Sequence, residues 1–207
     1  MNAPRRAAAF LDRDGVVVDE VGYLSRAADV RLSTGAAAAI RRLNEREVPV
    51  VVVTNQAGVA RGKFAEAAIA EVHATIDRLL AAACARIDRY YYCPHHPEAS
   101  VERYRIACAC RKPMPGMLEQ AARELELDLP RSWLVGDKLS DLEAAAQAGA
   151  QAILVRSGYG RETERALEPA RALARAVADD LPAAVEIMFA DWFSAQPPIA
   201  AGRAGRD

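Results

Sequence analysis

Residues 48–55, VPVVVVTN, decide the fold of this 207-residue chain. The run is almost entirely apolar and β-branched, and it ends in two hydrogen-bonding side chains, Thr54 and Asn55. A strand that is apolar on both faces is typical of a parallel sheet covered by helices on both sides. The stretch therefore predicts an open parallel sheet with polar groups at a strand end.

Short apolar runs and helical patterns alternate on both sides of this stretch. Four further strands are expected at 7–12, 87–92, 132–137 and 152–157. Helices are expected at 35–47, 65–86, 115–127, 140–149 and 181–193. This alternation predicts an α/β fold, a three-layer Rossmann-like open parallel sheet with helices on both faces. We expect residues 1–195 to form a single domain and 196–207 a disordered tail.

Composition limits the classes of partner. The formal net charge is −1, so the chain lacks the basic field that attracts nucleic acid. The hydrophobic fraction of 52% with 27% charged residues argues against a disordered chain. The first apolar run ends at Asp12, too early for a signal peptide, and no run approaches the roughly 18 apolar residues of a membrane span. A cytoplasmic protein without nucleic-acid or membrane partners is expected.

Acidic and basic side chains lie at the predicted strand ends. Asp12 and Asp14 follow the first strand, and Asp137 with Lys138 ends the fourth, while Lys112 lies in the connection between the third and fourth. Ligands of open α/β sheets bind beyond the carboxyl ends of the strands. Carboxylate oxygens suit Mg²⁺, and Thr54 with a Lys beside that ion suits a phosphoryl group. Asp141 is expected either to hold Lys138 in place or to cap the helix that begins near 140.

A long connection at about 93–114 contains three of the four cysteines of the chain. Cys93-Pro94-His95 and Cys108-Ala109-Cys110 form a C-x-H…C-x-C set, whose three thiolates and one imidazole match structural zinc. His95 and His96 are adjacent, so spacing alone does not choose the fourth ligand. Zinc would anchor a loop that has no core of its own. His73, between apolar positions of the long helix, is expected to be either solvated or a helix-face residue.

The ordered set DxDG, a strand ending in Thr, a later Lys and GDKxxD resembles the haloacid dehalogenase-like phosphatase superfamily between about residues 8 and 158. The resemblance implies that Asp12 is the nucleophile that forms an aspartyl-phosphate, and that Asp14 is the general acid and base. It further implies that Thr54 and Lys112 hold the phosphoryl oxygens. Catalytic Mg²⁺ would be held by Asp12, Asp137 and the main-chain carbonyl of Asp14.

Longer stretches resemble a narrower group, the D-glycero-D-manno-heptose 1,7-bisphosphate 7-phosphatases. They are FLDRDG (10–15), GYL (22–24), VVVTNQAGVARGKF (51–64), YYYCPHHPE (90–98), CACRKPMPGML (108–118) and VGDKLSD (135–141). This resemblance implies a minimal cap, structural Zn²⁺ on Cys93, His95, Cys108 and Cys110, and removal of the 7-phosphate on the route to nucleotide-activated heptose. A small enzyme of this kind is expected to act as a monomer on a phosphorylated sugar. The residues implied to contact that substrate are Glu20, Gly22, Tyr23, Asn55, Gln56, Arg111 and Lys138.

Two alternatives stay open. Zinc-bearing histidinol-phosphate phosphatases share the DxD, the Thr, the Lys and the cysteine loop, and only GYL (22–24) with RGKF (61–64) favours the heptose group. A zinc-stabilised binding module without catalysis would use the locally basic segment 103–112. Against the binding module, three Asp residues at the predicted strand ends would repel a nucleic-acid phosphate.

Overall fold

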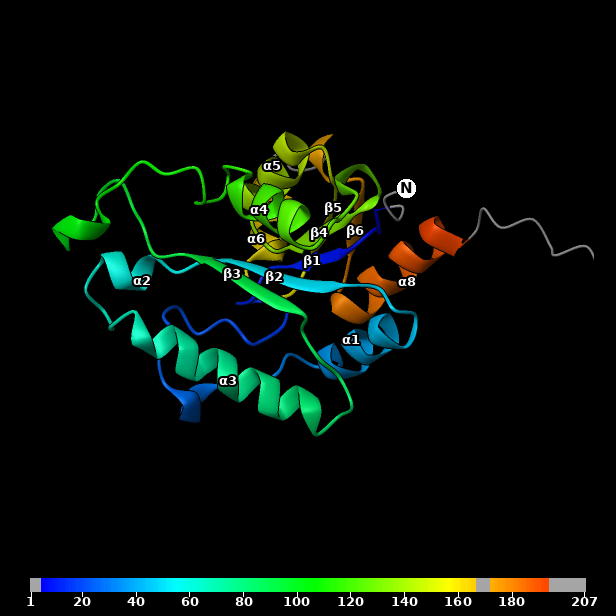
Figure 1. Cartoon of the computed structure of the whole chain (residues 1–207), viewed down its shortest axis with the longest axis horizontal. Coiled ribbons are helices and arrows are strands. Elements are labelled where there is room, and N and C mark those ends of the chain that lie inside the picture. The colour runs from blue at the N-terminus through cyan, green and yellow to red at the C-terminus, as the bar shows by residue number, and fades with distance from the viewer. Residues whose placement is uncertain (1–4, 167–171, 194–207) are drawn as a thin grey trace, which may run out of the picture.

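A six-stranded parallel sheet, in the order β3-β2-β1-β4-β5-β6, organises the molecule (Figure 1). The computed structural model describes residues 5–166 and 172–193. The strands are β1 (Ala9–Leu11), β2 (Val50–Asn55), β3 (Arg89–Cys93), β4 (Trp133–Gly136), β5 (Gln151–Val155) and β6 (Ala176–Ala178). The α-helices are α1 (Ala36–Glu45), α2 (Ala57–Ala60), α3 (Ala67–Ala81), α4 (Gly116–Glu124), α5 (Leu139–Ala148), α6 (Gly160–Ala166) and α8 (Leu181–Phe193). Short 3₁₀ turns are η1 (Ala27–Asp29), η2 (Glu102–Tyr104) and η3 (Leu129–Arg131).

Alternate residues of each central strand enter two separate cores. On β2, Val50 and Val52 pack with one cluster while Val51 and Val53 pack with the other, and all four are fully buried. The first cluster contains apolar residues of α1, α3 and α8, and the second those of α4 and α5. Figure 1 shows these two groups of helices on opposite faces of the sheet. The prediction of a three-layer α/β fold from the valine-rich run is therefore confirmed.

The five predicted strands and five predicted helices are all present, with shifts at their ends. The long helix is shorter than expected, because it ends at Ala81 rather than near 86. The sequence does not predict α2, α6 or β6; α2 has four residues and β6 only three, AVA, too few to show a pattern. The predicted tail at 196–207 lies outside the described residues. The single-domain organisation of 1–195 stays a prediction.

The strand order places the site. β1 is hydrogen-bonded to β2 on one side and β4 on the other, so chain segments leaving these strands diverge from a common point. Such a point is where open α/β sheets form their binding crevice. Among the described residues, none of the helices is long and apolar enough to cross a membrane.

Candidate active site

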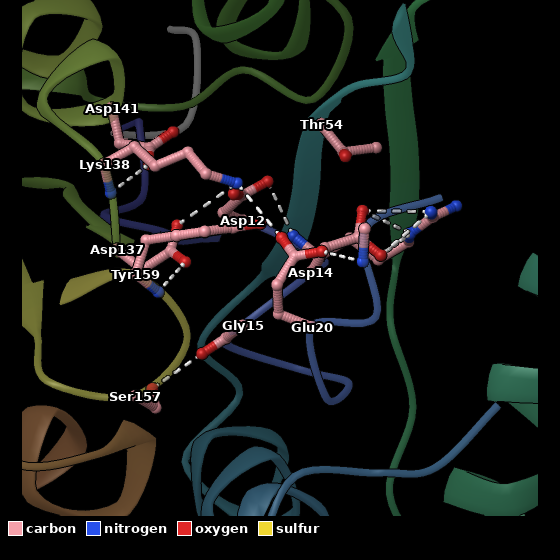
Figure 2. Close-up of polar contacts among 12 residues, drawn as sticks. Asp12, Asp14, Gly15, Glu20, Thr54, Asp137, Lys138, Asp141, Ser157 and Tyr159 are labelled. Carbon is pink, nitrogen blue, oxygen red and sulfur yellow. Dashed lines mark hydrogen bonds and ion pairs between the residues drawn. The ribbon is translucent and has the colours of Figure 1, made fainter. Parts of the chain in front are cut away.

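Three predicted site residues meet at the carboxyl ends of the central strands. Asp12 follows β1, Thr54 lies at the end of β2, and Asp137 follows β4. The Asp12 N–H donates to the carbonyl of Val135 at 2.9 Å, which extends the β1–β4 ladder to Asp12. All three residues are at most 5% exposed, and Figure 2 shows them on adjacent segments. The strand-end pattern therefore does bring these groups together.

Lys112 reaches the same point from the loop before α4. Its Nζ lies 3.0 Å from Asp12 Oδ1, forms a second ion pair with Asp141, and donates to the Val53 carbonyl at 2.8 Å. Burial by itself would lower the pKa of the ammonium, but the charges of Asp12 and Asp141 raise the pKa of Lys112 above its usual value. Lys112 is therefore a fixed positive charge beside Asp12, where it could attract phosphoryl oxygens.

Asp141 does more than the sequence suggests. Its Oδ2 accepts a hydrogen bond from the Lys138 N–H at 3.0 Å, so the expectation that it caps the helix is confirmed. Its other oxygen pairs with Lys112, which makes it part of the pocket wall. The Lys138 ammonium turns away from Asp141 and pairs with Glu20 at 3.1 Å.

A cation would fit between the carboxylates. Oxygens of Asp12, Asp137 and Asp141 lie within 4.8 Å of one another. Asp137 Oδ1 is buried and accepts no hydrogen bond from the described residues, while Oδ2 accepts one from the Tyr159 N–H at 2.8 Å (Figure 2). Burial, together with the charge of Asp12, raises the pKa of Asp137 to about 8. Asp137 Oδ1 has the Lys138 ammonium 3.9 Å away as an ion-pair partner but accepts no hydrogen bond from any described residue, and such an oxygen in an acidic cluster suits a hard cation such as Mg²⁺.

Two glycines let the backbone close around Asp137. A Cβ on Gly15 would lie 2.4 Å from Asp137 Oδ2, and one on Gly158 would lie 2.2 Å from the same atom. Both residues have positive φ angles, 86° and 54°, which disfavour other residue types. The Ser157 hydroxyl donates to the Gly15 carbonyl at 2.6 Å and ties the two segments together (Figure 2).

The carboxylate of Asp14 is held beside Asp12 by two side chains. Arg13 forms an ion pair with it at 2.9 Å, and Gln56 Nε2 donates to its Oδ2 at 3.0 Å. The same Nε2 donates to Thr54 Oγ1 at 2.8 Å. Gln56 therefore connects Asp14 to Thr54 and is largely occupied by protein partners.

Asn55 is also occupied by the protein. Its Nδ2 donates to the Lys112 carbonyl at 2.9 Å, and its Oδ1 accepts from the Lys112 N–H at 3.0 Å. This pair of hydrogen bonds joins the end of β2 to the loop that carries Lys112. Asn55 therefore positions Lys112, whatever it contacts in a substrate.

The pocket mouth carries most of the remaining predicted substrate residues. Glu20 accepts a hydrogen bond from the Gly22 N–H at 2.6 Å, and Tyr23 is 41% exposed at the rim. Arg111 is not among the described residues that line this pocket, because its guanidinium donates to the His95 carbonyl at 3.2 Å. The pocket is lined by Asp12, Arg13, Asp14, Glu20, Gly22, Tyr23, Leu24, Thr54, Asn55, Gln56, Ala57, Gly58, Lys112, Lys138, Ser140 and Asp141.

The four predicted zinc ligands form a compact cluster. The Sγ atom of Cys108 lies 3.5 Å from that of Cys93 and 3.3 Å from that of Cys110, and His95 Nδ1 lies 3.7 and 3.5 Å from Cys93 and Cys110. A tetrahedral zinc with bonds of about 2.3 Å requires edges of roughly this length. Burial raises the pKa of the Cys93 thiol and so favours its protonated form. Coordination to a metal ion would have the opposite effect, because a coordinated thiol loses its proton.

The geometry also chooses between the adjacent histidines. His95 turns Nδ1 to the thiols, whereas His96 Nε2 lies 3.4 Å from Arg61 and its Nδ1 accepts from the Glu98 N–H. The chemistry of the donor set therefore fits zinc with His95 as the fourth ligand.

Several residues at the site carry no signal that sequence reasoning used. Arg13 and His73 are buried, at 1% and 8% exposure, so the expectation of a solvated His73 is wrong. The imidazole ring of His73 stacks on the ring of Tyr90 in β3, and the two ring centroids lie 4.2 Å apart. The sequence analysis also assigns no role to segment 157–160. Its Ser-Gly-Tyr-Gly sequence after a strand is nevertheless a signal for a close approach of the backbone to another group.

Known proteins share this arrangement of sequence and fold. A family model described as HAD-hydrolase-like matches residues 109–184. The D-glycero-β-D-manno-heptose-1,7-bisphosphate 7-phosphatase of Rhodopseudomonas palustris is 46% identical over 148 residues, 72% of this chain and 82% of that protein. The enzyme of the same name from Photorhabdus laumondii is 41% identical over 181 residues, covering 86% and 95%.

Solved structures extend the likeness to three dimensions. A D,D-heptose 1,7-bisphosphate phosphatase from B. bronchiseptica, crystallised with magnesium and phosphate, superposes with a TM-score of 0.79 at 37% identity, covering 88% of this chain and 98% of that one. A D,D-heptose 1,7-bisphosphate phosphatase from Burkholderia thailandensis gives a TM-score of 0.64 at 29% identity, covering 89% and 99%. Because identity above 40% extends over most of the chain, this chain belongs to the D-glycero-β-D-manno-heptose-1,7-bisphosphate 7-phosphatase family of HAD-like hydrolases.

Proposed function

We propose that this chain is a Mg²⁺-dependent phosphatase that hydrolyses the 7-phosphate of D-glycero-β-D-manno-heptose 1,7-bisphosphate, a step toward nucleotide-activated heptose. The observation that carries the proposal is the contact of buried Lys112 with Asp12 inside the carboxylate cluster. In the proposed mechanism Asp12 is the nucleophile and Lys112 is the cation that attracts the phosphate, and their side chains lie 3.0 Å apart. The names of the relatives supply the substrate.

In the first half of the proposed reaction, an Asp12 oxygen forms a bond to phosphorus while the bond from phosphorus to the sugar O7 breaks. Asp14 gives its proton to the departing oxygen. In the second half, a water oxygen attacks phosphorus, the bond to Asp12 breaks, and Asp14 takes the proton of the water. Thr54 and Lys112 hold the non-bridging oxygens.

Asp12, Asp137 and the main-chain carbonyl of Asp14 would hold the Mg²⁺. Bound there, the ion neutralises charge on the phosphoryl oxygens and on the carboxylates. Asp141 lies in the same cluster, but its ion pair with Lys112 and its cap of α5 make it a support for the lysine.

The mouth of the pocket is proposed to bind the sugar. Glu20, Gly22, Tyr23 and Lys138 line it directly, and Asn55 and Gln56 lie deeper beside Lys112 and Asp14. Arg111 would have to leave the His95 carbonyl to reach a substrate. Zn²⁺ on Cys93, His95, Cys108 and Cys110 would be structural. We further propose a cytoplasmic enzyme that acts as a monomer, with residues 1–195 as its single domain.

Two other functions receive less support. Eight relatives at 39–46% identity are named for the heptose bisphosphate rather than for histidinol phosphate. A binding module without catalysis would have no use for a buried lysine paired with two buried aspartates. The heptose phosphatase is therefore the favoured function.

Phosphate release tests the proposal. The purified chain with Mg²⁺ should hydrolyse the heptose bisphosphate with a higher kcat/KM than histidinol phosphate, measured side by side. Asp12→Asn should reduce release to the background rate, because the amide cannot form the phosphoryl ester. Thermal unfolding of this variant provides the folding control. Turnover that is unchanged in Asp12→Asn would refute the mechanism, and a preference for histidinol phosphate would refute the substrate.

A further inference from the structure

Arg13, between the two aspartates of the DxD motif, is buried in the middle of a hydrogen-bond network. Its side chain is 1% exposed, although a guanidinium is among the costliest groups to remove from water. Nε and Nη2 both donate to the Asp14 carboxylate, at 3.0–3.2 Å, in the two-pronged geometry that arginine favours. Nη2 also donates to Gln56 Oε1 at 3.0 Å.

His73, from α3, supplies the remaining contact. Its Nε2 lies 3.5 Å from Arg13 Nη1. A guanidinium has no acceptor, so Nε2 must be the acceptor and the proton must be on Nδ1. Burial and the charge of Arg13 lower the pKa of His73 to about 3, which keeps the imidazole neutral.

The imidazole is itself held in place. It stacks on Tyr90 with centroids 4.2 Å apart and an interplanar angle of 17°, and it meets Tyr92 edge-on at 6.3 Å. Tyr90 is anchored in turn, because its hydroxyl donates to Asp77 at 2.7 Å. A rigid chain of contacts therefore runs from α3 and β3 through His73 and Arg13 to Asp14.

We propose that Arg13 and His73 are positioning residues that fix the carboxyl group of Asp14 for its proton transfers. This inference rests on the proposed function, in which Asp14 protonates the departing O7. The guanidinium of Arg13 donates hydrogen bonds to both oxygens of Asp14. Its further hydrogen bonds to His73 and Gln56 prevent the guanidinium from rotating. Without His73, Nη1 would lose its buried acceptor, and Arg13 would have to shift toward water or another partner.

Comparing two substrates whose leaving groups differ in their need for a proton tests this positioning role. A primary sugar phosphate leaves as a basic alkoxide and needs a proton, whereas p-nitrophenolate leaves well without one. kcat/KM reports the steps up to formation of the phosphoryl-enzyme, when the acid acts. His73→Phe keeps the stacking on Tyr90 but removes the acceptor. We expect it to lower kcat/KM for the heptose bisphosphate roughly tenfold and that for p-nitrophenyl phosphate less than about threefold.

Companion variants make the test specific. His73→Gln, which offers an amide oxygen to Arg13, should recover part of the lost activity on the sugar phosphate. Arg13→Lys keeps the charge but cannot bridge Asp14, Gln56 and His73, and should be at least as impaired as His73→Phe. Ile76→Val is a matched control on α3, since it removes a buried methyl of the same helix without touching Arg13, and it should leave both kcat/KM values near wild type.

Each outcome has one meaning. A loss on the sugar phosphate that exceeds the loss on p-nitrophenyl phosphate supports the positioning role. Equal losses on both substrates, or none, overturn it, because a merely structural defect reduces the active fraction for every substrate alike. If the wild type hydrolyses neither compound, the proposed function fails instead, and this result is distinct from the others.

Discussion

Two buried cations determine how the site is held together at the scale of single residues. Lys112 pairs with Asp12 and Asp141, and Arg13 pairs with Asp14. Buried charges persist only where partners and hydrogen bonds compensate the loss of water. Each cation therefore also fixes the orientation of a carboxylate, and the proposed catalytic groups are ordered before any substrate arrives.

The neutral state of His73 should make the protein less stable in acid. Its folded-state pKa is lowered from 6.5 to about 3 by burial and Arg13, and the rings facing it belong to Tyr90 and Tyr92. Below about pH 6.5 the unfolded chain binds a proton at His73 that the folded chain does not. This contribution to stability is therefore complete above pH 6.5 and declines as pH falls toward 3, by ~2 kcal/mol at about pH 5.

Urea denaturation of wild type and His73→Phe at about pH 8 and pH 5 measures this effect. The variant cannot bind the proton, so its free energy of unfolding should gain ~2 kcal/mol relative to wild type on acidification. A difference between the two proteins that stays constant with pH would show that His73 titrates normally in the folded state.

The residues at strand ends could be predicted from sequence, but their supporting partners could not. Asp12, Thr54 and Asp137 each follow an apolar run, and neighbouring parallel strands end at the same edge. The contact between Arg13 and His73 joins positions 60 residues apart and leaves no periodic mark. The prediction of a solvated His73 is therefore wrong, although it follows from the rule that a polar residue on an amphipathic helix is usually solvated.

At the scale of elements, the connection from β3 to α4 links the cluster of three cysteines and His95 to the pocket. Cys93 is the last residue of β3, Cys110 is two residues before Lys112, and α4 begins at Gly116. Asn55 then fastens the backbone of Lys112 to β2. The position of the buried lysine therefore depends on both ends of this loop.

Removal of zinc should lower activity through Lys112. With the metal gone, the thiols of Cys93 and Cys110 lose their common partner, and the loop should loosen up to Lys112. We expect the zinc-free protein, verified by metal analysis, to lose at least about tenfold in kcat while Mg²⁺ is present. Cys108→Ser should behave similarly, and Cys84→Ser, at an exposed position outside the cluster, is the matched control. Full activity in zinc-free protein would contradict the coupling.

The elements differ in how visible they are in the sequence. The strands that are buried on both faces appear as continuous apolar runs, and helices such as α3 appear as apolar stripes at steps of three and four. β6 is an edge strand of three residues whose pairing with β5 depends on the sheet already present. In the segment from Ser157 to Thr163, the Tyr159 N–H donates to the Asp137 carboxylate and the Thr163 hydroxyl donates to the Asp137 carbonyl, and no periodic pattern marks these two contacts in the sequence.

At the scale of the whole molecule, the sheet gathers negative charge at one edge. The strand order makes β2 and β4 flank β1, so that Asp12, Asp137 and Asp141 occupy a single buried cluster. Like charges in a buried cluster oppose folding, and the raised pKa of Asp137 is a sign of this cost. The site therefore trades stability of the metal-free fold for affinity toward a cation and a phosphoryl group.

Asp137→Asn should separate stability from metal response. The amide keeps the shape of the side chain and can still accept from the Tyr159 N–H, but it removes the ionisable group whose charge is opposed by burial and by Asp12. Without metal, the variant should melt higher than wild type by roughly 2–4 °C for each kcal/mol of relieved repulsion.

Mg²⁺ at a hundredfold excess over its dissociation constant should stabilise wild type by ~2.7 kcal/mol and the variant far less. Melting curves of protein freed of Mg²⁺ by dialysis, recorded without and with added Mg²⁺, measure both effects. Asp179→Asn, which breaks only a surface pair with Arg156, should melt as wild type does and keep the full Mg²⁺ shift. An equal Mg²⁺ shift in Asp137→Asn and wild type would place the ion elsewhere.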